Sequence, residues 1–253
     1  MLIEEQYTNT ILHADALDIN VLPPSCSDVI ITSPPYNVGV EYSKENKDSD
    51  ALFYEEYISK FTDTWLHNCY HWGKEQARLC VNVFFDNPRG GRTLMVGDIN
   101  RQALKQGWQF RSIIFWTKSN GRRTCWGSWK SATAPNIVQA CEAILIYHKG
   151  EWKRKGGTSD IEGEEFKNWT HGIWDFRSEV ASNIGHPAPF PYELPKRLIK
   201  LFSFKEDIVL DPFMGSGTTA LAAGALGRKY IGIEKEKEYI NLARNRLGLH
   251  LGA

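Results

Sequence analysis

Apolar residues along the chain alternate between short compact runs and longer stretches with helical spacing. The compact runs predict buried strands at 11–15, 29–32, 78–83, 110–116, 143–147, 208–210 and 230–233. Apolar and aromatic residues spaced three or four apart predict helices at 53–72, 94–106, 193–202, 218–226 and 237–247. Strands that alternate with helices form a parallel sheet with helices on both faces. We therefore expect an α/β fold with a mostly parallel sheet.

The length of 253 residues has room for one α/β domain with a small appendage. We expect a single domain over 1–253, and the loss of periodicity over 150–185 indicates a loop-rich insert. No run of eighteen apolar residues occurs, so we expect no membrane span. The first residues do not resemble a signal peptide, which favours a cytoplasmic protein.

The five cysteines are odd in number and include no Cys-x-x-Cys pair. A disulfide framework or a metal site is therefore not expected, and a reducing cytoplasm fits best. The formal net charge of zero is mild evidence against a nucleic-acid partner. The charge is uneven, however, because the stretch 111–155 carries nine basic side chains against two acidic ones. A local basic surface can bind DNA in a neutral protein.

A glycine-rich turn follows the predicted strand 208–210 and opens a predicted helix, with the sequence Asp211-Pro212-Phe213-Met214-Gly215-Ser216-Gly217-Thr218-Thr219. Glycines let the backbone approach a ligand, and free N–H groups at a helix start favour an anion. Glu234 ends the next strand, where an acidic side chain can bind ribose hydroxyls. The alternative, a tight turn without a ligand, explains the glycines but not the full strand–loop–helix–strand–Glu order.

This motif resembles the cofactor motif of DNA methyltransferases that modify exocyclic amino groups. The resemblance implies S-adenosylmethionine as cofactor, with its methionine part wrapped by the loop and its ribose held by Glu234. It also implies that Asp15, followed by Ala16, meets the adenine of the cofactor. A simple turn-capping role for Asp15 stays open. The implied contacts of the loop are Asp211, Pro212, Phe213, Gly215, Ser216, Gly217 and Thr218.

A second motif, Thr32-Ser33-Pro34-Pro35-Tyr36-Asn37, follows the strand 29–32 and is similar to the catalytic motif of the same family. An exocyclic amine is a poor nucleophile because its lone pair is delocalised into the ring. Acceptors on its N–H bonds localise that lone pair, and Ser33 Oγ and the Pro34 carbonyl are the candidates. Pro34 and Pro35 stiffen the turn, and Tyr36 can stack on a flipped-out base. Alternatively, the two prolines only end a strand beside a surface aromatic residue.

The catalytic motif precedes the cofactor motif, an order that resembles the beta arrangement of this family. The resemblance implies a Rossmann-like, circularly permuted methyltransferase fold with a small target-recognition insert, which we place at 119–185. Arg122, Arg123 and Lys130 are the expected DNA contacts, and the turn 87–92 is a second candidate loop. A solvated basic face is the alternative. The tryptophans interleaved with these basic residues are Trp126, Trp129, Trp152, Trp169 and Trp174.

The expected function is site-specific methylation of N4 of cytosine in double-stranded DNA. The resemblance favours N4 because adenine enzymes more often carry Asp or Asn where this chain has Ser33, and a serine hydroxyl can also donate to the ring nitrogen N3. Asn37 is shared with many adenine enzymes, so adenine N6 is the alternative. An RNA or protein methyltransferase and a non-catalytic DNA-binding relative are further alternatives. A restriction endonuclease for the same site is an expected partner, and the protein is expected to be a monomer or homodimer.

Overall fold

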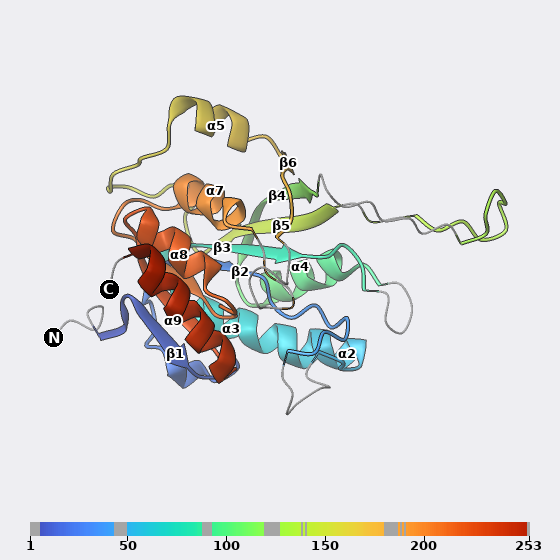
Figure 1. Cartoon of the computed structure of the whole chain (residues 1–253), viewed down its shortest axis with the longest axis horizontal. Helices are drawn as coiled ribbons and strands as arrows, with labels where there is room; N and C mark the ends of the chain where they lie inside the picture. Colours follow the sequence, from blue (N-terminus) through green and yellow to red (C-terminus); the bar gives the residue numbers. More distant parts are fainter. Residues whose placement is uncertain are drawn as a thin grey trace.

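The computed structural model describes residues 6–42, 50–87, 93–118, 127–137, 139, 141–179, 187, 189 and 191–251. In this part of the chain, eight strands form one sheet in the order β1-β8-β7-β2-β3-β5-β4-β6 (Figure 1). Their pairings show that β5 alone runs against the other described strands. The strands are β1 Thr10–His13, β2 Ser27–Thr32, β3 Gly73–Val83, β4 Gln109–Thr117, β5 Cys141–His148, β6 Ile173–Asp175, β7 Ile208–Asp211 and β8 Lys229–Glu234. The mostly parallel Rossmann-like sheet expected from the sequence is confirmed.

Side chains of the central strands alternate between two apolar layers, because successive residues of a strand point to opposite faces. On β2, Ile30 joins the layer that packs under α3 (Asp63–Trp72) and α4 (Met95–Lys105). Val29 and Ile31 join the layer under α7 and α8. Those helices span Glu193–Phe202 and Thr218–Ala225, and α9 (Lys237–Leu251) packs against α8 and β1. Helices therefore cover both faces of the sheet, as predicted.

The stretch 150–185 is more ordered than its composition indicated. It contains α5 (Gly163–Trp169), which begins with a reciprocal capping box between Glu162 and Glu165, and the edge strand β6. Trp169 and Trp174 are buried in the apolar layer under α7. Their placement among target-recognition residues was therefore wrong, because these indoles fill the core.

The long helix predicted over 53–72 is interrupted. It consists of α2 (Tyr54–Glu56), a π-helical segment (Tyr57–Thr62) and α3. No helix of the described residues is both long and apolar enough to cross a membrane. The described cysteines are free thiols, and three of the four are buried.

The two sequence motifs meet because their strands are neighbours. β2 pairs with β7 in parallel, with Ile30 opposite Leu210, so the chain leaves both strands at the same edge of the sheet. β3 flanks β2 on its other side. In open α/β sheets ligands bind at such a carboxyl edge, where neighbouring connections diverge. The fold thus brings Ser33 and the glycine loop, about 180 residues apart in sequence, to one place.

Candidate active site

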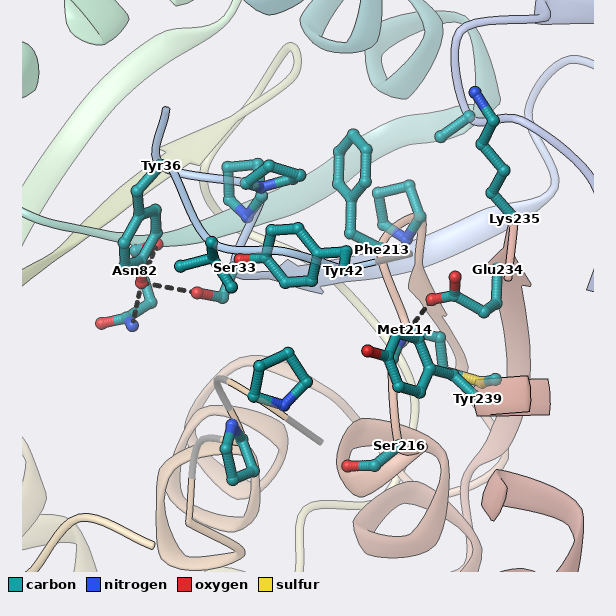
Figure 2. Close-up of a pocket in the computed structure, with 18 of the residues that line it drawn as sticks. Ser33, Tyr36, Tyr42, Asn82, Phe213, Met214, Ser216, Glu234, Lys235 and Tyr239 are labelled. Carbon is teal, nitrogen blue, oxygen red and sulfur yellow. Dashed lines mark hydrogen bonds between the residues drawn. The ribbon is translucent and has the colours of Figure 1, made fainter. Parts of the chain in front are cut away.

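A cavity of about 730 Å³ opens at this edge of the sheet. Its size lies within the roughly 300–1,000 Å³ typical of small-molecule sites. Figure 2 shows Ser33 and Tyr36 at one end, Glu234 at the other and Phe213 between them. The residues expected from the sequence that line it are Asp15, Ala16, Ser33, Pro34, Pro35, Tyr36, Pro212, Phe213, Gly215, Ser216, Thr218 and Glu234.

The loop after β7 takes a backbone path that requires its glycines. Gly215 has φ 52° and Gly217 has φ 80°, a left-handed conformation that costs side-chain-bearing residues free energy. A Cβ on Gly217 would lie 2.8 Å from the Cβ of Ala243 in α9. Arg246 of the same helix donates from Nη1 to the Ser216 carbonyl, at 2.5 Å. The loop is therefore clamped between β7 and α9, and α8 begins at Thr218 with its amino end toward the cavity.

Asp211 and Gly217 do not line the cavity, although the motif implied contacts from both. Asp211 is buried beneath the loop and accepts from the Phe213 backbone N–H (3.1 Å) and from Thr219 Oγ1 (2.6 Å). Burial raises the pKa of this carboxyl to about 6, against the opposing effect of these two hydrogen bonds. Asp211 and Gly217 therefore shape the loop from behind.

Glu234 ties the glycine loop to the end of β8. Its Oε2 accepts from the Gly215 N–H and its Oε1 from the Glu236 N–H, both at 2.8 Å. Burial raises the pKa of this carboxyl above its usual range. Each carboxylate oxygen has a further lone pair, so Glu234 can still accept from a ligand hydroxyl in the cavity.

Asp15 combines the two roles that the sequence left open. Its Oδ1 caps a turn by accepting from the Leu17 N–H at 3.0 Å, and its Oδ2 pairs with Lys235 at 2.9 Å. Asp15 and Ala16 also line the cavity beside Glu234 and Lys235. A turn-capping carboxylate therefore stands where a ligand amine can reach it.

The catalytic-motif residues form the opposite end of the cavity. Ser33 Oγ and the Tyr36 hydroxyl lie 2.5 Å apart, and the Tyr36 ring contacts the Phe84 ring with a centroid distance of 4.5 Å. Pro34 is buried and Pro35 accepts from Tyr57 Oη at 2.8 Å. The Pro-Pro turn is thus held from both sides, and an aromatic wall faces the cavity.

Three site residues were missed in the sequence. Asn82 ends the apolar run of β3, Glu142 begins that of β5, and Lys118 follows β4; all three line the cavity beside Tyr36. Asn82 and Glu142 are buried, and Glu142 forms an ion pair with Lys118. A polar residue in an otherwise apolar strand was the available signal. That signal does not tell where Glu142 lies, because the start of β5 reaches this edge only when β5 runs antiparallel to β3.

Asn37 is a structural residue of the loop that follows the catalytic motif. It is buried with φ 58°, exchanges hydrogen bonds with the backbone of Leu52 (2.9 and 2.8 Å) and does not line the cavity. Its backbone N–H donates to Asp50 at 2.6 Å. Asn37 therefore stabilises this loop and has no contact with the cavity.

The expected DNA contacts are only partly visible. Arg122 and Arg123 lie outside the described residues, as does most of the turn 87–92. Lys130 is exposed and stands over the Trp129 ring, 5.6 Å from its centroid. Figure 1 shows residues 127–137 far from the sheet, beyond the ends of β4 and β5. Because β4 ends at the cavity edge of the sheet, this arm leaves the sheet on the cavity side. Within the segment 119–185, β5 belongs to the core.

Comparison with known proteins shows the family to which the chain belongs. A DNA methylase family model of the N6- and N4-type matches residues 27–245. The type II methyltransferase M.MjaVI of Methanocaldococcus jannaschii is 40% identical over 177 residues, which cover 69% of this chain and 89% of that protein. M.BglI of Bacillus subtilis is 53% identical over 209 residues, covering 78% of this chain and 56% of that protein.

Solved structures agree. A DNA modification methylase of Thermus thermophilus in complex with S-adenosyl-L-methionine superposes with a TM-score of 0.75, 26% identity and 96% coverage of both chains. The cytosine-N4-specific PvuII methyltransferase shares the fold, with a TM-score of 0.72, 21% identity and coverage of 94% of this chain and 85% of that one. The chain therefore belongs to the DNA methylases that use S-adenosylmethionine to methylate an exocyclic amino group, N4 of cytosine or N6 of adenine.

Proposed function

We propose that this enzyme methylates N4 of cytosine at a specific sequence in double-stranded DNA, with the target base swung out into the cavity. The observation that carries the choice of base is the group at the first motif position. Ser33 presents a neutral hydroxyl there, hydrogen-bonded to Tyr36, where an ionised Asp would be a stronger acceptor and could also take a proton. A weaker acceptor fits the serine-bearing cytosine branch that the motif resembles.

The residues present fit S-adenosylmethionine at the other end of the cavity. The amino end of α8, with Ser216 and Thr218 beside it, suits the carboxylate of the methionine part. Glu234 would hold the ribose hydroxyls and Asp15 the adenine amine, while Phe213 offers an apolar wall. When bound, the cofactor supplies a methyl group activated by a sulfonium.

The protein contributes position and electrostatics at the amine. Ser33 Oγ and the Pro34 carbonyl accept from its N–H bonds and so localise its lone pair. The Tyr36 ring stacks on the base, and its π face favours the positive charge that develops on nitrogen. The Pro34-Pro35 turn keeps these acceptors in place, and such fixed geometry is where most of the rate gain arises.

Adenine N6 is the second candidate. The DNA adenine methyltransferase YhdJ of Escherichia coli K12 is 30% identical over 260 residues, which cover 94% of this chain and 82% of that protein. A hydroxyl acceptor also fits the amino group of adenine. One similar protein is named for adenine and one similar structure for cytosine N4, so these names do not decide between the two bases. Asn37 does not line the cavity, so a contact with the base does not explain why it is shared with many adenine enzymes.

Nucleoside mass spectrometry decides between the bases. PCR-amplified genomic DNA, which contains no methylated bases, is incubated with the purified protein and S-adenosylmethionine and digested to nucleosides. We expect N4-methylcytosine, and its slower accumulation with Ser33→Ala in the same assay. N6-methyladenine without N4-methylcytosine would make the adenine alternative correct. Sequencing the modified DNA would give the recognition site.

We further propose that the segment 119–185, apart from β5, carries target recognition through Arg122, Arg123 and Lys130. M.MjaVI and M.BglI are type II methyltransferases, which supports a restriction endonuclease acting on the same site as partner, in the cytoplasm. Cleavage of unmodified but not of modified DNA by a candidate endonuclease would test this. Light scattering on the purified protein would distinguish a monomer from a homodimer.

A further inference from the structure

The hydroxyl of Tyr36 is surrounded by polar atoms from three strands or strand ends. Besides Ser33 Oγ at 2.5 Å, it lies 2.8 Å from Asn82 Nδ2, 3.1 Å from the Asn82 carbonyl and 3.4 Å from Glu142 Oε2. Figure 2 shows Ser33 and Asn82 on opposite sides of this hydroxyl. A phenyl ring without a hydroxyl would also stack on a base, so stacking does not account for these contacts.

The Glu142 carboxylate fixes which way the Asn82 amide points. Asn82 Nδ2 lies 2.6 Å from Glu142 Oε2, and only the amino group of an amide can face a carboxylate oxygen at that distance. The other oxygen of Glu142 is held by Lys118. The second hydrogen of Asn82 Nδ2 is then left for the oxygen of Tyr36.

Counting hydrogens assigns the contact between Tyr36 and Ser33. The phenol has one hydrogen, and the Asn82 carbonyl and Glu142 Oε2 both face it as acceptors without hydrogens of their own. If that hydrogen pointed to Ser33, the Tyr36 oxygen and the main-chain carbonyl oxygen of Asn82 would lie 3.1 Å apart with no hydrogen between them. If the phenol instead donates its hydrogen to the main-chain carbonyl of Asn82, the two lone pairs of the phenol oxygen can accept from the Asn82 side-chain amine and from the Ser33 O–H. The phenol oxygen then uses its hydrogen and both lone pairs, and Glu142 Oε2 keeps its hydrogen bond from the Asn82 amine.

We propose that Glu142 is a positioning residue that acts through Asn82 and Tyr36 to hold the Ser33 hydroxyl hydrogen on Tyr36. Both lone pairs of Ser33 Oγ then face the cavity as acceptors for the amino group of the base. This inference rests on the proposed function, in which Ser33 accepts from that amine. Because the Ser33 hydroxyl hydrogen is directed to Tyr36, Ser33 cannot donate it to a ring nitrogen of the base. Ser33 therefore recognises a hydrogen-bond donor on the substrate, such as its amino group.

The electrostatics of the cluster support this direction. Burial, and after it the nearby charge of Glu142, raise the pKa of Tyr36 well above its ordinary value. The phenol therefore keeps its hydrogen and stays an uncharged relay at neutral pH. The Lys118–Glu142 pair lies at the cavity wall, where the two charges compensate each other.

A double-mutant cycle tests the relay through single-turnover methyl transfer to PCR-amplified DNA. Tyr36→Phe keeps the ring and removes the relay, and Glu142→Gln leaves its oxygen with Lys118 and turns an amino group toward Asn82. Each change should slow transfer about tenfold, the effect of one well-placed hydrogen bond. Because Glu142 acts through the Tyr36 hydroxyl, the double mutant should be as slow as Tyr36→Phe alone. S-adenosylmethionine affinity should stay within about twofold of wild type in all three.

The outcomes separate the hypotheses. Effects that multiply to about a hundredfold in the double mutant would show independent roles and overturn the relay, as would two single variants with full rates. Glu193→Gln, which removes a carboxylate paired with Arg197 on α7, controls for loss of an ion pair and should keep the wild-type rate. If Glu142→Gln does not fold, the cycle of Ser33→Ala with Tyr36→Phe replaces it, since removing the phenol oxygen should cost nothing further once Ser33 is gone. Wild-type enzyme that methylates neither base would overturn the proposed function, and the relay with it.

Discussion

The two ends of the cavity are built from different kinds of atoms. At the cofactor end, the path of the main chain shapes the site: Gly215 and Gly217 adopt left-handed conformations, and the Gly215 N–H is held by Glu234. At the base end, the site is made by side chains from strands far apart in sequence, with Ser33, Asn82 and Glu142 joined around one hydroxyl. The cofactor end therefore depends more on backbone conformation, and the base end depends more on contacts between side chains.

This difference determines how each end of the cavity responds to mutation. A backbone site fails as a unit because one strained residue displaces every N–H of the loop. A side-chain network fails in parts, because each group can be removed while the strands stay in place. Cofactor binding and methyl transfer should therefore respond to different mutations, and the variants below separate them.

Gly217→Val should have the largest effect, a loss of S-adenosylmethionine affinity of about a hundredfold or more. A φ of 80° costs a side-chain-bearing residue about 1–3 kcal/mol, and the new Cβ meets Ala243 at 2.8 Å, which adds about 1–3 kcal/mol of overpacking. Isothermal titration calorimetry measures the loss. Gly163→Val is the matched control, because a Cβ there meets nothing within 4 Å. Unchanged affinity of Gly217→Val would place the cofactor elsewhere.

Tyr36→Ala should slow methyl transfer by roughly 5- to 150-fold beyond the effect of Tyr36→Phe, the equivalent of about 1–3 kcal/mol of stacking per base, while the cofactor affinity stays the same. The two assays on one variant test whether the ends are separable. Tyr36→Phe, which keeps the ring, should be the less impaired of the two variants. Full turnover by Tyr36→Ala on duplex DNA would refute the stacking role, and a parallel loss of cofactor affinity would refute the division into two ends.

The contrast also explains how far the sequence predicted the site. The glycine loop and the Ser33-Pro34-Pro35-Tyr36 turn are local in sequence, because backbone conformation depends on neighbouring residues. Their adjacency followed from the expected parallel sheet. Asp211 is a motif residue whose hydrogen bonds stabilise the glycine loop itself. Membership of a ligand-binding motif therefore does not imply that a residue contacts the ligand.

The base end could not be predicted to the same depth because its partners depend on strand order. Asn82 and Glu142 meet only because β5 reverses direction beside β3, and the compact apolar run of β5 carries no mark of its direction. The prediction for two of the tryptophans was wrong for a related reason. Trp169 and Trp174 lie in the same proposed recognition segment, 119–185, as exposed Trp129, and only tertiary packing distinguishes a core indole from a surface one.

Asp211→Asn should change how stability depends on pH. The folded-state pKa of about 6 lies above the ordinary value of 3.8, so the folded protein holds this proton more tightly than the unfolded chain. In wild type this group therefore lowers the free energy of unfolding as pH rises from about 4 to about 6, by about 2 kcal/mol. Urea unfolding across that window should show this decrease weakened in Asp211→Asn. Parallel curves for the two proteins would mean that the carboxyl is not strained by burial.

The smallest effect expected is on DNA affinity at the arm, outside both ends of the cavity. Alanine at Arg122, Arg123 and Lys130 should weaken DNA binding and reduce the dependence of log K on log salt by about one for each phosphate interaction that is removed. In a chain with no net charge, such binding must come from a local surface. A charge-matched control replaces Lys105, Lys205 and Lys229, which lie at or shortly before the starts of β4, β7 and β8 and so at the opposite edge of the sheet. Since salt acts on every phosphate interaction alike, equal slopes for the two triple mutants would place the duplex away from the arm, whatever their absolute affinities.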